Sequence, residues 1–191
     1  MAQRINVLFF VFSNISVFAQ LGGESTYQFL NMVSSPRQAA LGGKVITNLD
    51  YDVTSGLYNP ATINPEMDNQ LALNYASYLG GISYGTGAYA YTWDRHVQTF
   101  HVGMTYINYG KFDGYDQNGV STGTFTGNEA ALSFGYALRI TYSDFYVGVS
   151  GKLITSKLEQ YNSIGGAIDA GIIYINEDLD FHAAISVRNL G

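Results

Sequence analysis

Three histidines are the first residues whose chemistry can be tested against their spacing. His96 lies in a predicted turn, and His101 and His182 lie in predicted strands that are far apart along the chain. Zinc sites built from histidine usually contain a close pair, as in the HExxH pattern of a helix, and these residues form no such pair. The sequence also contains no cysteine that could act as a ligand or nucleophile. We therefore expect no metal site and no cofactor, and we assign the strand histidines to hydrogen bonding.

Five charged side chains form a second candidate site. They share the small and polar face of the predicted strands: Arg139, Lys152, Asp169, Asp180 and Arg188. Paired carboxylates perform general acid and base catalysis in many enzymes, and charged residues also line substrate paths. Mixed charges in a confined space instead pair with one another. Because both signs are present, we expect a mutually neutralising network inside the fold, the lumen network.

Serines on the same face raise a third chemical hypothesis, a serine hydrolase. These serines are Ser133, Ser150 and Ser186. A hydrolase brings serine, histidine and an acid together, and none of the three serines lies in a nucleophile elbow. Four glycines share their face: Gly103, Gly135, Gly148 and Gly171. Because a strand glycine permits close approach of another backbone, we expect these glycines to admit a second segment of chain. We predict no catalytic residue and no enzymatic activity.

The elements that position these residues follow from a hydrophobic period of two. One face of residues 99–106 carries Phe100, Val102, Met104 and Tyr106. The alternation recurs in seven segments, which begin near residues 70, 84, 98, 129, 145, 164 and 178. A charge facing lipid costs about 2–4 kcal/mol at the bilayer midplane, and the strand charges avoid the apolar face. We therefore expect an all-β protein, an antiparallel transmembrane β-barrel whose strands occupy residues 70–191.

The composition agrees with this class of fold. Charged residues make up only 13% of the chain, whereas aromatic residues make up 15% and include 16 tyrosines. Tyrosine is enriched at membrane interfaces. The net charge of −6 and the lack of lysine and arginine clusters argue against a nucleic-acid partner.

The first 19 residues are typical of a signal peptide. Arg4 supplies a positive charge, an apolar run extends from Ile5 to Phe18, and Val17 and Ala19 are small residues before a predicted cut ahead of Gln20. The run is shorter than the ~20 residues that span a bilayer as a helix. We expect an exported chain without a transmembrane helix.

The connections between the predicted strands differ in length. Three of them are tight: residues 94–97, 141–144 and 176–178. Residues 110–127 form a long polar stretch rich in glycine, aspartate and asparagine. Because outer-membrane barrels have short periplasmic turns and long outer loops, we expect this stretch outside the cell. Its aromatic residues Phe112, Tyr115 and Phe125 are the predicted contacts to a protein partner.

Residues 20–69 precede the strands and read as a small hatch. Ser34 or Ser35 can cap a short helix that begins at Pro36 and ends before Gly42. Asn-Pro pairs at residues 59–60 and 64–65 then favour extended or turn geometry. Because a helix this short is unstable alone in water, it must pack against the barrel interior or rim. Arg37 is predicted to hold the hatch by an internal salt bridge, with a lumen carboxylate or a partner as alternatives.

Two stretches carry a family resemblance. "YQFLNMVSSPRQAALGG" (27–43) and "SGLYNPATI" (55–63), followed by tyrosine-rich strands, resemble the FadL-like outer-membrane barrels, and among them the PorQ-like family of the type IX secretion system. The hatch motif consists of Pro36, Arg37, Gly42, Gly43, Asn59, Pro60 and Ala61. The resemblance implies a barrel of about fourteen strands, of which seven segments would be about half. We expect the chain to be an N-terminal fragment of such a barrel.

What the resemblance implies about function is a membrane anchor. A PorQ-like protein would lie in the Gram-negative outer membrane, with lipid around it and its external loops at the cell surface. It would hold a PorZ-like partner in the attachment complex that also contains PorU and PorV. Two other hypotheses stay open. One is a FadL-like channel for hydrophobic compounds, and the other is a secreted β-sandwich adhesin.

Overall fold

The computed structural model describes residues 27–94 and 98–191. The predicted signal peptide (1–19), the first residues of the hatch (20–26) and His96 lie outside the described residues.

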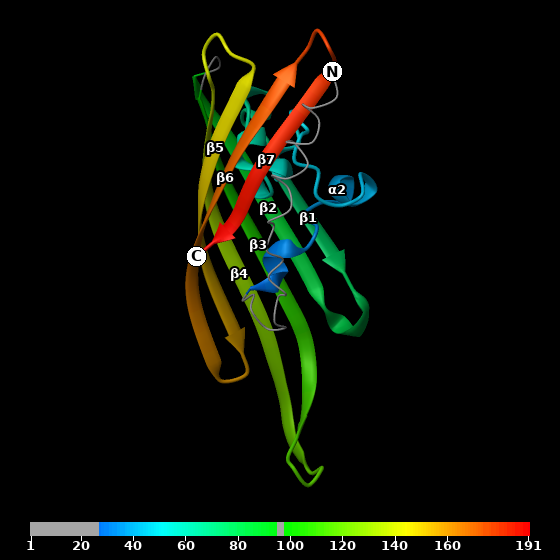
Figure 1. Ribbon diagram of the computed structural model, residues 1–191. Coiled ribbons are helices and arrows are strands. Elements are labelled where there is room, and N and C mark those ends of the chain that lie inside the picture. Colours follow the sequence, from blue (N-terminus) through cyan, green and yellow to red (C-terminus); the bar gives the residue numbers. More distant parts are fainter. Residues whose placement is uncertain (1–26, 95–97) are drawn as a thin grey trace, which may run out of the picture.

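The protein folds as one antiparallel sheet of seven strands, and each strand pairs with its neighbours in sequence (Figure 1). The strands are β1 (Leu71–Ser77), β2 (Ser83–Asp94), β3 (Gln98–Tyr115), β4 (Ser121–Arg139), β5 (Phe145–Leu158), β6 (Tyr161–Asn176) and β7 (Phe181–Leu190). The prediction of seven antiparallel strands is confirmed. The sheet is open, since the outer edges of β1 and β7 pair with no strand among the described residues. A β-sandwich would need a second sheet, and the described residues form one.

The predicted boundaries are wrong at three strands. β4 begins at Ser121 rather than near residue 129, β6 at Tyr161 rather than near 164, and β7 at Phe181 rather than near 178. The largest error concerns residues 110–127, which are the end of β3, a short turn and the start of β4 rather than a long loop. β-branched and aromatic residues in this stretch, such as Thr124 and Phe125, pair across the two strands.

The hatch is made of short helical segments. They are η2 (Gln28–Asn31), α2 (Pro36–Ala40), η3 (Val53–Leu57), η4 (Pro60–Thr62) and η5 (Pro65–Met67); a further turn, η6 (Leu79–Gly81), joins β1 to β2. The predicted helix at Pro36 is confirmed. Ser35 Oγ accepts a hydrogen bond from the N–H of Gln38 at 3.2 Å, and Gly42 and Gly43 follow with φ of 94° and 121°.

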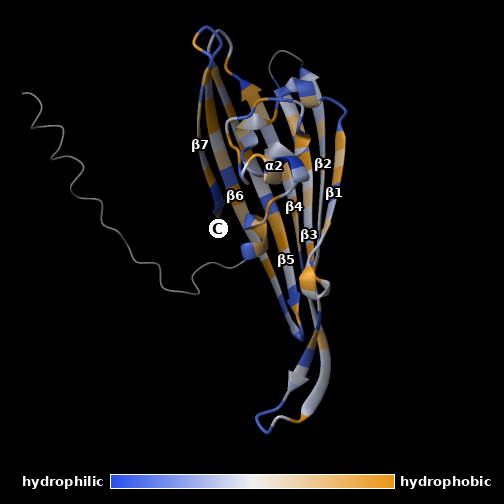
Figure 2. Ribbon diagram, turned by 90° about the vertical axis from the view of Figure 1, so that its right-hand side faces the viewer, coloured by the Kyte–Doolittle hydropathy of each residue, from blue (hydrophilic) through white to orange (hydrophobic). Residues whose placement is uncertain are grey.

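The two faces of the sheet have different environments. Along β5, residues alternate between buried and exposed from Gly148 to Thr155, and the same alternation occurs in β3, β4 and β6. Figure 2 shows the hatch against one face of the sheet and the change of hydropathy from residue to residue along the strands. The hatch therefore covers one face only.

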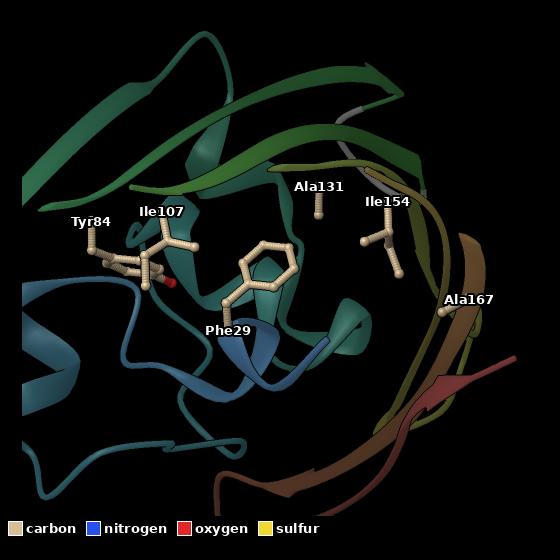
Figure 3. Close-up of a cluster of buried hydrophobic side chains, with 6 residues drawn as sticks. All are labelled: Phe29, Tyr84, Ile107, Ala131, Ile154 and Ala167. Atoms are coloured by element: carbon tan, nitrogen blue, oxygen red, sulfur yellow. The ribbon is translucent and has the colours of Figure 1, made fainter. Parts of the chain in front are cut away.

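The core lies between the hatch and the concave face of the sheet. Figure 3 shows the sheet curving around Phe29 of η2, with strand side chains directed toward it. This cluster contains Phe29, Tyr84, Ile107, Ala131, Ile154 and Ala167. Two smaller clusters join Val53 and Met67 to β2, and Ala61 to Ile173 and Ile175 of β6. Because each cluster contains hatch and strand residues, the hatch is a structural part of this fold.

Candidate functional site

The Asn59-Pro60-Ala61 element lies at the centre of the hatch contact and is fully buried. Asn59 fixes it: its Oδ1 accepts the N–H of Ala61 at 3.0 Å, and its Nδ2 donates to the carbonyl of Ile46 at 2.7 Å. Pro60 occupies the first helical position, where the missing N–H costs nothing. The element therefore forms a rigid turn with its polar groups satisfied.

Asn64-Pro65 repeats the arrangement one turn later. Asn64 Oδ1 accepts the N–H of Glu66 at 2.8 Å, and its Nδ2 donates to the carbonyls of Asp50 and Thr62 at 2.8 and 2.9 Å. Both asparagines thus cap a short helical turn and tie it to an earlier part of the hatch. The two Asn-Pro pairs predict turns, but the sequence alone does not predict these cross-links.

The four inward glycines form the seat of the hatch, the glycine seat. A Cβ at Gly148 would overlap the backbone of Pro60 and Ala61, and one at Gly171 would overlap the side chain of Asn59. At Gly103 it would overlap Leu57, and at Gly135 it would lie 2.8 Å from Ile63 Cδ1. The prediction that Gly103, Gly135, Gly148 and Gly171 make room for the hatch is confirmed. Close packing of a loop on a sheet therefore explains their positions.

His101 belongs to the same contact. Its side chain is buried under η3, and its Nε2 lies 2.9 Å from the carbonyl oxygen of Val53. The ring also packs against Gly56, since a Cβ added there would lie 3.0 Å from His101 Nε2. Since one ring nitrogen is used to hold the hatch, His101 has a structural partner, as the sequence predicted. The described residues contain no group of three histidines and acids that could hold a metal ion.

The lumen network is only partly assembled. Lys152 Nζ lies 2.5 Å from Asp169 Oδ2, and the two side chains are 5% and 0% exposed. Asn189 joins this pair, because its Oδ1 accepts from Lys152 at 2.8 Å and its N–H donates to Asp169 Oδ1 at 2.8 Å. Ser150 Oγ is 3.4 Å from Asp169 Oδ2. Buried ions are paired and hydrogen-bonded here, as burial requires.

Arg188 lies close to the pair without joining it. Its guanidinium carbon is 5.7 Å from the centre of the Tyr58 ring, and the Tyr58 hydroxyl binds Met32 and Ser34 of the hatch. Ser186 donates to the carbonyl of Tyr58 at 3.2 Å. Tyr58 thus connects β7 to the hatch. Tyr58 is not among the residues predicted from the sequence, although its place directly before Asn59-Pro60 is a signal that points to it.

The remaining two members lie elsewhere, which corrects the prediction of one network. Asp180 is exposed in the turn before β7, with φ of 47°, because that strand begins one residue later. Arg139 ends β4 and stacks over Tyr146 at 5.5 Å, beside a polar cavity of about 190 Å³ that Asp144 and Glu177 also line. The alternation of residues along the strands predicts that both lie on one face of the sheet. It does not predict how far along the strand direction each of them lies.

Arg37 pairs with Asp50, a residue of the hatch itself, and its guanidinium carbon lies 5.1 Å from the Tyr51 ring centre. The predicted internal salt bridge is confirmed. Asp50 also accepts from Asn48 at 2.7 Å and from the N–H of Asp52 at 2.8 Å, so it organises the loop before η3. Arg37 therefore braces the hatch against its own chain.

The three serines that a hydrolase would need are distributed over the hatch contact. Ser133 Oγ donates to the carbonyl of Gly103 at 3.1 Å, while Ser150 and Ser186 bind Asp169 and Tyr58 as described above. His101, the buried histidine, binds a backbone carbonyl rather than a serine. These contacts bring no serine, histidine and acid together.

The opposite face of the sheet carries exposed apolar side chains. They include Leu73, Tyr75, Tyr91, Trp93, Phe100, Met104, Phe134, Val149, Leu153, Ile168, Ile172 and Ile185, which are 45–75% exposed. An apolar groove of about 410 Å³ runs across this face over β4 to β7. Exposed apolar surfaces of this size are uncommon on monomeric soluble proteins and usually mark a site of contact with lipid or protein.

The β3–β4 hairpin extends past the rest of the sheet (Figure 1). The pairing shifts register between Asn108 and Lys111, and beyond that point Phe112 and Phe125 lie directly opposite each other with ring centres 5.3 Å apart. Tyr115 is 65% exposed near the tip. The predicted partner-binding residues thus lie on an ordered hairpin, and the stacked pair forms one cross-strand contact.

None of the helices in residues 27–94 and 98–191 is long and apolar enough to cross a membrane. Comparison of the chain with protein-family models, curated proteins and solved structures finds no match.

Proposed function

We propose that this chain forms part of the wall of a Gram-negative outer-membrane barrel and encloses its own hatch. The observation that carries the proposal is the division between the faces of the sheet. One face packs the hatch and holds the buried Lys152–Asp169 pair, and the other exposes large apolar side chains over β1 to β7. Lipid would cover the second face and bury its apolar surface.

The distribution of charge supports lipid as the occupant. Glu129, Lys152 and Asp169 are buried on the hatch side of the strands. Lys157 shares the alternation of the apolar face, but it is the penultimate residue of β5, next to the turn. Its long side chain can reach the headgroup region from there. A soluble partner would cover only part of this face and would not require charges to be absent from the rest of it.

Strand parity supports completion of the wall by other strands. In an antiparallel sheet of seven strands, β1 and β7 run in the same direction. A second copy in the same membrane orientation would therefore place its β1 parallel to β7. Antiparallel closure instead needs an odd number of additional strands. Closure is required in lipid because open edges leave backbone groups unsatisfied.

Within this wall, we propose the anchoring role that the PorQ-like resemblance implies. The chain would hold a PorZ-like partner at the cell surface, together with PorU and PorV, as part of the type IX secretion system. The projecting hairpin supports this role, since Phe112, Tyr115 and Phe125 sit on an ordered scaffold rather than in a flexible loop. Exposed aromatic side chains are common anchors of protein interfaces.

Membrane insertion can be tested with Trp93, the single tryptophan of the chain. It is 74% exposed near one end of β2 on the apolar face. In vesicles of dibrominated phosphatidylcholine we expect quenching of its fluorescence, strongest with bromines near the headgroup. A matched control moves the tryptophan to the hairpin tip with Trp93→Tyr and Tyr115→Trp, where iodide in water should quench instead. Equal quenching of both proteins by iodide alone would contradict insertion.

The anchoring role can be tested with the hairpin in the native envelope. We expect Phe112→Ser, Tyr115→Ser and Phe125→Ser combined to release the surface partner into the medium, measured by fractionation. Tyr142, fully exposed in the β4–β5 turn, provides a control at the other end of the sheet as Tyr142→Ser. Retention of the partner by the triple variant would refute the assignment even if Trp93 reports insertion.

A channel for hydrophobic compounds is the second candidate, favoured by one observation. An apolar cavity of about 120 Å³ lies between α2 and β1, lined by residues that include Pro36, Ala39, Tyr75 and Tyr84. It lies at an open edge of the sheet, but it is smaller than the roughly 300–1,000 Å³ of most ligand sites. Uptake of a fluorescent fatty acid by reconstituted protein, abolished by Ala39→Trp, would favour the channel.

A further inference from the structure

The backbone groups at the open edge of β1 can be assigned. β1 pairs with β2 on one side, and no strand among the described residues lies on its other side. At one end of the pair the N–H of Ala90 donates to the carbonyl of Gln70, and at the other end the N–H of Tyr78 donates to the carbonyl of Ile82. Every second residue of an antiparallel strand bonds to the same neighbour. The β1 residues that bond to β2 are therefore Ala72, Asn74 and Ala76.

The alternate residues of β1 direct their N–H and carbonyl groups to the open edge. They are Leu71, Leu73, Tyr75 and Ser77. Their side chains lie on the exposed face of the sheet, whereas the side chains of the three residues bonded to β2 lie on the face that the hatch covers. A strand added at this edge would bond to the first set. Its side chains opposite the second set would point toward the hatch.

A cavity of about 120 Å³ lies beside this edge, between α2 and β1. Pro36 and Ala39 border it on the hatch side, and Asn74, Tyr75 and Ala76 border it on the side of β1. Because Tyr75 carries its side chain on the opposite face, the cavity reaches the edge of the sheet. Its volume is close to the ~150 Å³ that removal of one leucine side chain leaves in a protein core. The cavity therefore has room for one side chain of a neighbouring strand.

Most polar groups at this cavity already have partners. Asn74 Nδ2 donates to Thr86 Oγ1 at 3.3 Å, and Ser35 Oγ accepts the N–H of Gln38 at 3.2 Å. Ser34 Oγ is the exception, since it is buried and has no partner among the described residues. The rest of the lining consists of proline, alanine, valine and tyrosine. An apolar side chain therefore suits the cavity, and Ser34 is the one group that would favour a hydroxyl.

We propose that the edge of β1 accepts an antiparallel strand, and that the hatch selects this strand by taking one bulky apolar side chain into the cavity. The backbone of the strand would bond to Leu73 and Tyr75, and its residue opposite Asn74 or Ala76 would enter the cavity. Leucine and methionine have the required size. Antiparallel pairing continues the order of the sheet.

A strand uses features of this site that a free hydrophobic compound leaves unused. The compound would fill the cavity but would leave the backbone groups of Leu73 and Tyr75 unpaired, and unpaired groups at an edge are costly in lipid. The inference rests on the proposed wall, which other strands complete. It adds that the strand beside β1 is recognised by the hatch as well as by β1.

The test uses the full chain in detergent micelles and a synthetic peptide as the probe. The peptide alternates threonine and valine over nine residues, carries leucine in place of the central threonine, and has a lysine at each end for solubility. Leucine and threonine would face the hatch, and valine would face outward. We expect saturable binding, measured by the anisotropy of a fluorescent label. Alanine in place of the leucine should weaken the affinity about tenfold or more.

Backbone methylation separates strand addition from simple binding of an apolar peptide. Methyl groups on the nitrogens of the two valines beside the leucine block N–H groups that face β1, and they should abolish binding. Methyl groups on the two nearest threonines block N–H groups that face away from β1, so this peptide is the matched control. Ala39→Trp places a large ring at the cavity and should remove the preference for leucine over alanine. Tyr142→Trp, in the distant and exposed β4–β5 turn, should leave the preference unchanged.

Several results would overturn the inference. Absence of saturable binding, equal affinity for the leucine and alanine peptides, or equal effects of the two methylated peptides would each exclude it. Tighter binding of a peptide with central threonine would assign the specificity to Ser34. Displacement of the peptide by lauric acid would assign the cavity to a hydrophobic compound, and dimers of the wild-type chain that Ala39→Trp dissociates would assign the edge to a second copy. Quenching of Trp93 reports membrane insertion separately, so failure of strand binding and failure of the proposed wall are distinguishable.

Discussion

The part of β3 and β4 under the hatch and the hairpin beyond it are made by the same two strands. Under the hatch, one face of the pair carries glycine at Gly103 and Gly135, and hatch side chains fill the space. Beyond the register shift, the hairpin has both faces largely exposed, and Gly110 at the shift and Gly123 in the hairpin have φ of 78° and 104°. Glycine supplies room in the first region and backbone freedom in the second.

The two regions differ in what stabilises them. In the hatch region, closely packed contacts and a buried ion pair make each residue depend on its neighbours. In the hairpin, stability comes from cross-strand pairs and a turn, each of which contributes little. Changes of similar chemistry should therefore have large effects under the hatch and small effects in the hairpin.

The largest effect is expected from the buried ion pair. Asp169→Asn leaves Lys152 charged and buried without its counter-ion, and we expect a loss of about 3–5 kcal/mol in the free energy of unfolding. Urea unfolding in detergent measures this loss. Asp113→Asn removes an exposed carboxylate from the hairpin and should change stability by less than about 0.5 kcal/mol. Equal effects of the two variants would break the comparison.

The double variant Lys152→Met with Asp169→Leu sharpens the same point. Replacing a buried pair by apolar residues of similar size often restores stability. If the double variant regains most of the free energy of unfolding that Asp169→Asn loses, the attraction between the two charges contributes little. The destabilisation would then come from the unpaired buried charge of Lys152.

The next effect concerns the glycine seat. Gly148→Ala places a methyl group on the backbone of Pro60 and Ala61, which cannot yield as a side chain would. We expect a loss of about 1–3 kcal/mol and faster proteolysis of the hatch. Gly151→Ala on the same strand is the matched control, since a Cβ there meets nothing within 4 Å. If the hatch of the Gly148→Ala variant resisted protease as well as that of the wild-type protein, the hatch would not pack closely on β5.

A smaller effect is expected from the stacked pair of the hairpin. Phe112→Ala removes its contact with Phe125, and aromatic pairs contribute about 0.5–1.5 kcal/mol beyond burial. Hydrogen exchange should increase for hairpin amides beyond Lys111 and stay unchanged near Phe100. Phe100→Ala, which breaks the Phe100–Tyr136 pair of the same strands, should instead affect the central sheet. Spreading of the Phe112 effect into the centre would remove the distinction between the regions.

The sequence predicted the central sheet better than its extremities, for physical reasons. Alternation is local, so the inward side of Lys152 and the seat at Gly148 could be inferred strand by strand. The hairpin was mistaken for a loop because glycine, aspartate and asparagine are turn residues, and they outweighed the alternation around Phe125. Asp180 was predicted to lie within the last strand, but β7 begins one residue later, at Phe181.

Contacts between distant segments could not be predicted in the same way. Tyr58 joins residues that are far apart in sequence, Ser34 and Ser186, through a contact that no spacing encodes. Similarly, alternation placed Arg139 and Lys152 on one face but could not show that they lie in different surroundings. The hatch motif predicted that a hatch exists. The hydrogen bonds that join its segments could be seen only in the structure.

The smallest effect concerns the hairpin turn and its dependence on pH. Asp116 Oδ1 accepts the N–H groups of Asn118 and Val120, each at 2.8 Å, and these hydrogen bonds lower the pKa of Asp116 from its usual 3.8. A carboxylate whose folded-state pKa is lowered stabilises the turn above its unfolded pKa, and this contribution is lost as the pH falls through the folded value. We therefore expect the amide signal of Val120 to titrate below pH 3.8, while the amide of Thr105 in the central part of β3 stays constant. Asp116→Ala should abolish that titration and leave the hatch protected from protease. If Asp116→Ala exposed the hatch to protease at neutral pH, the turn and the hatch region would not be independent units.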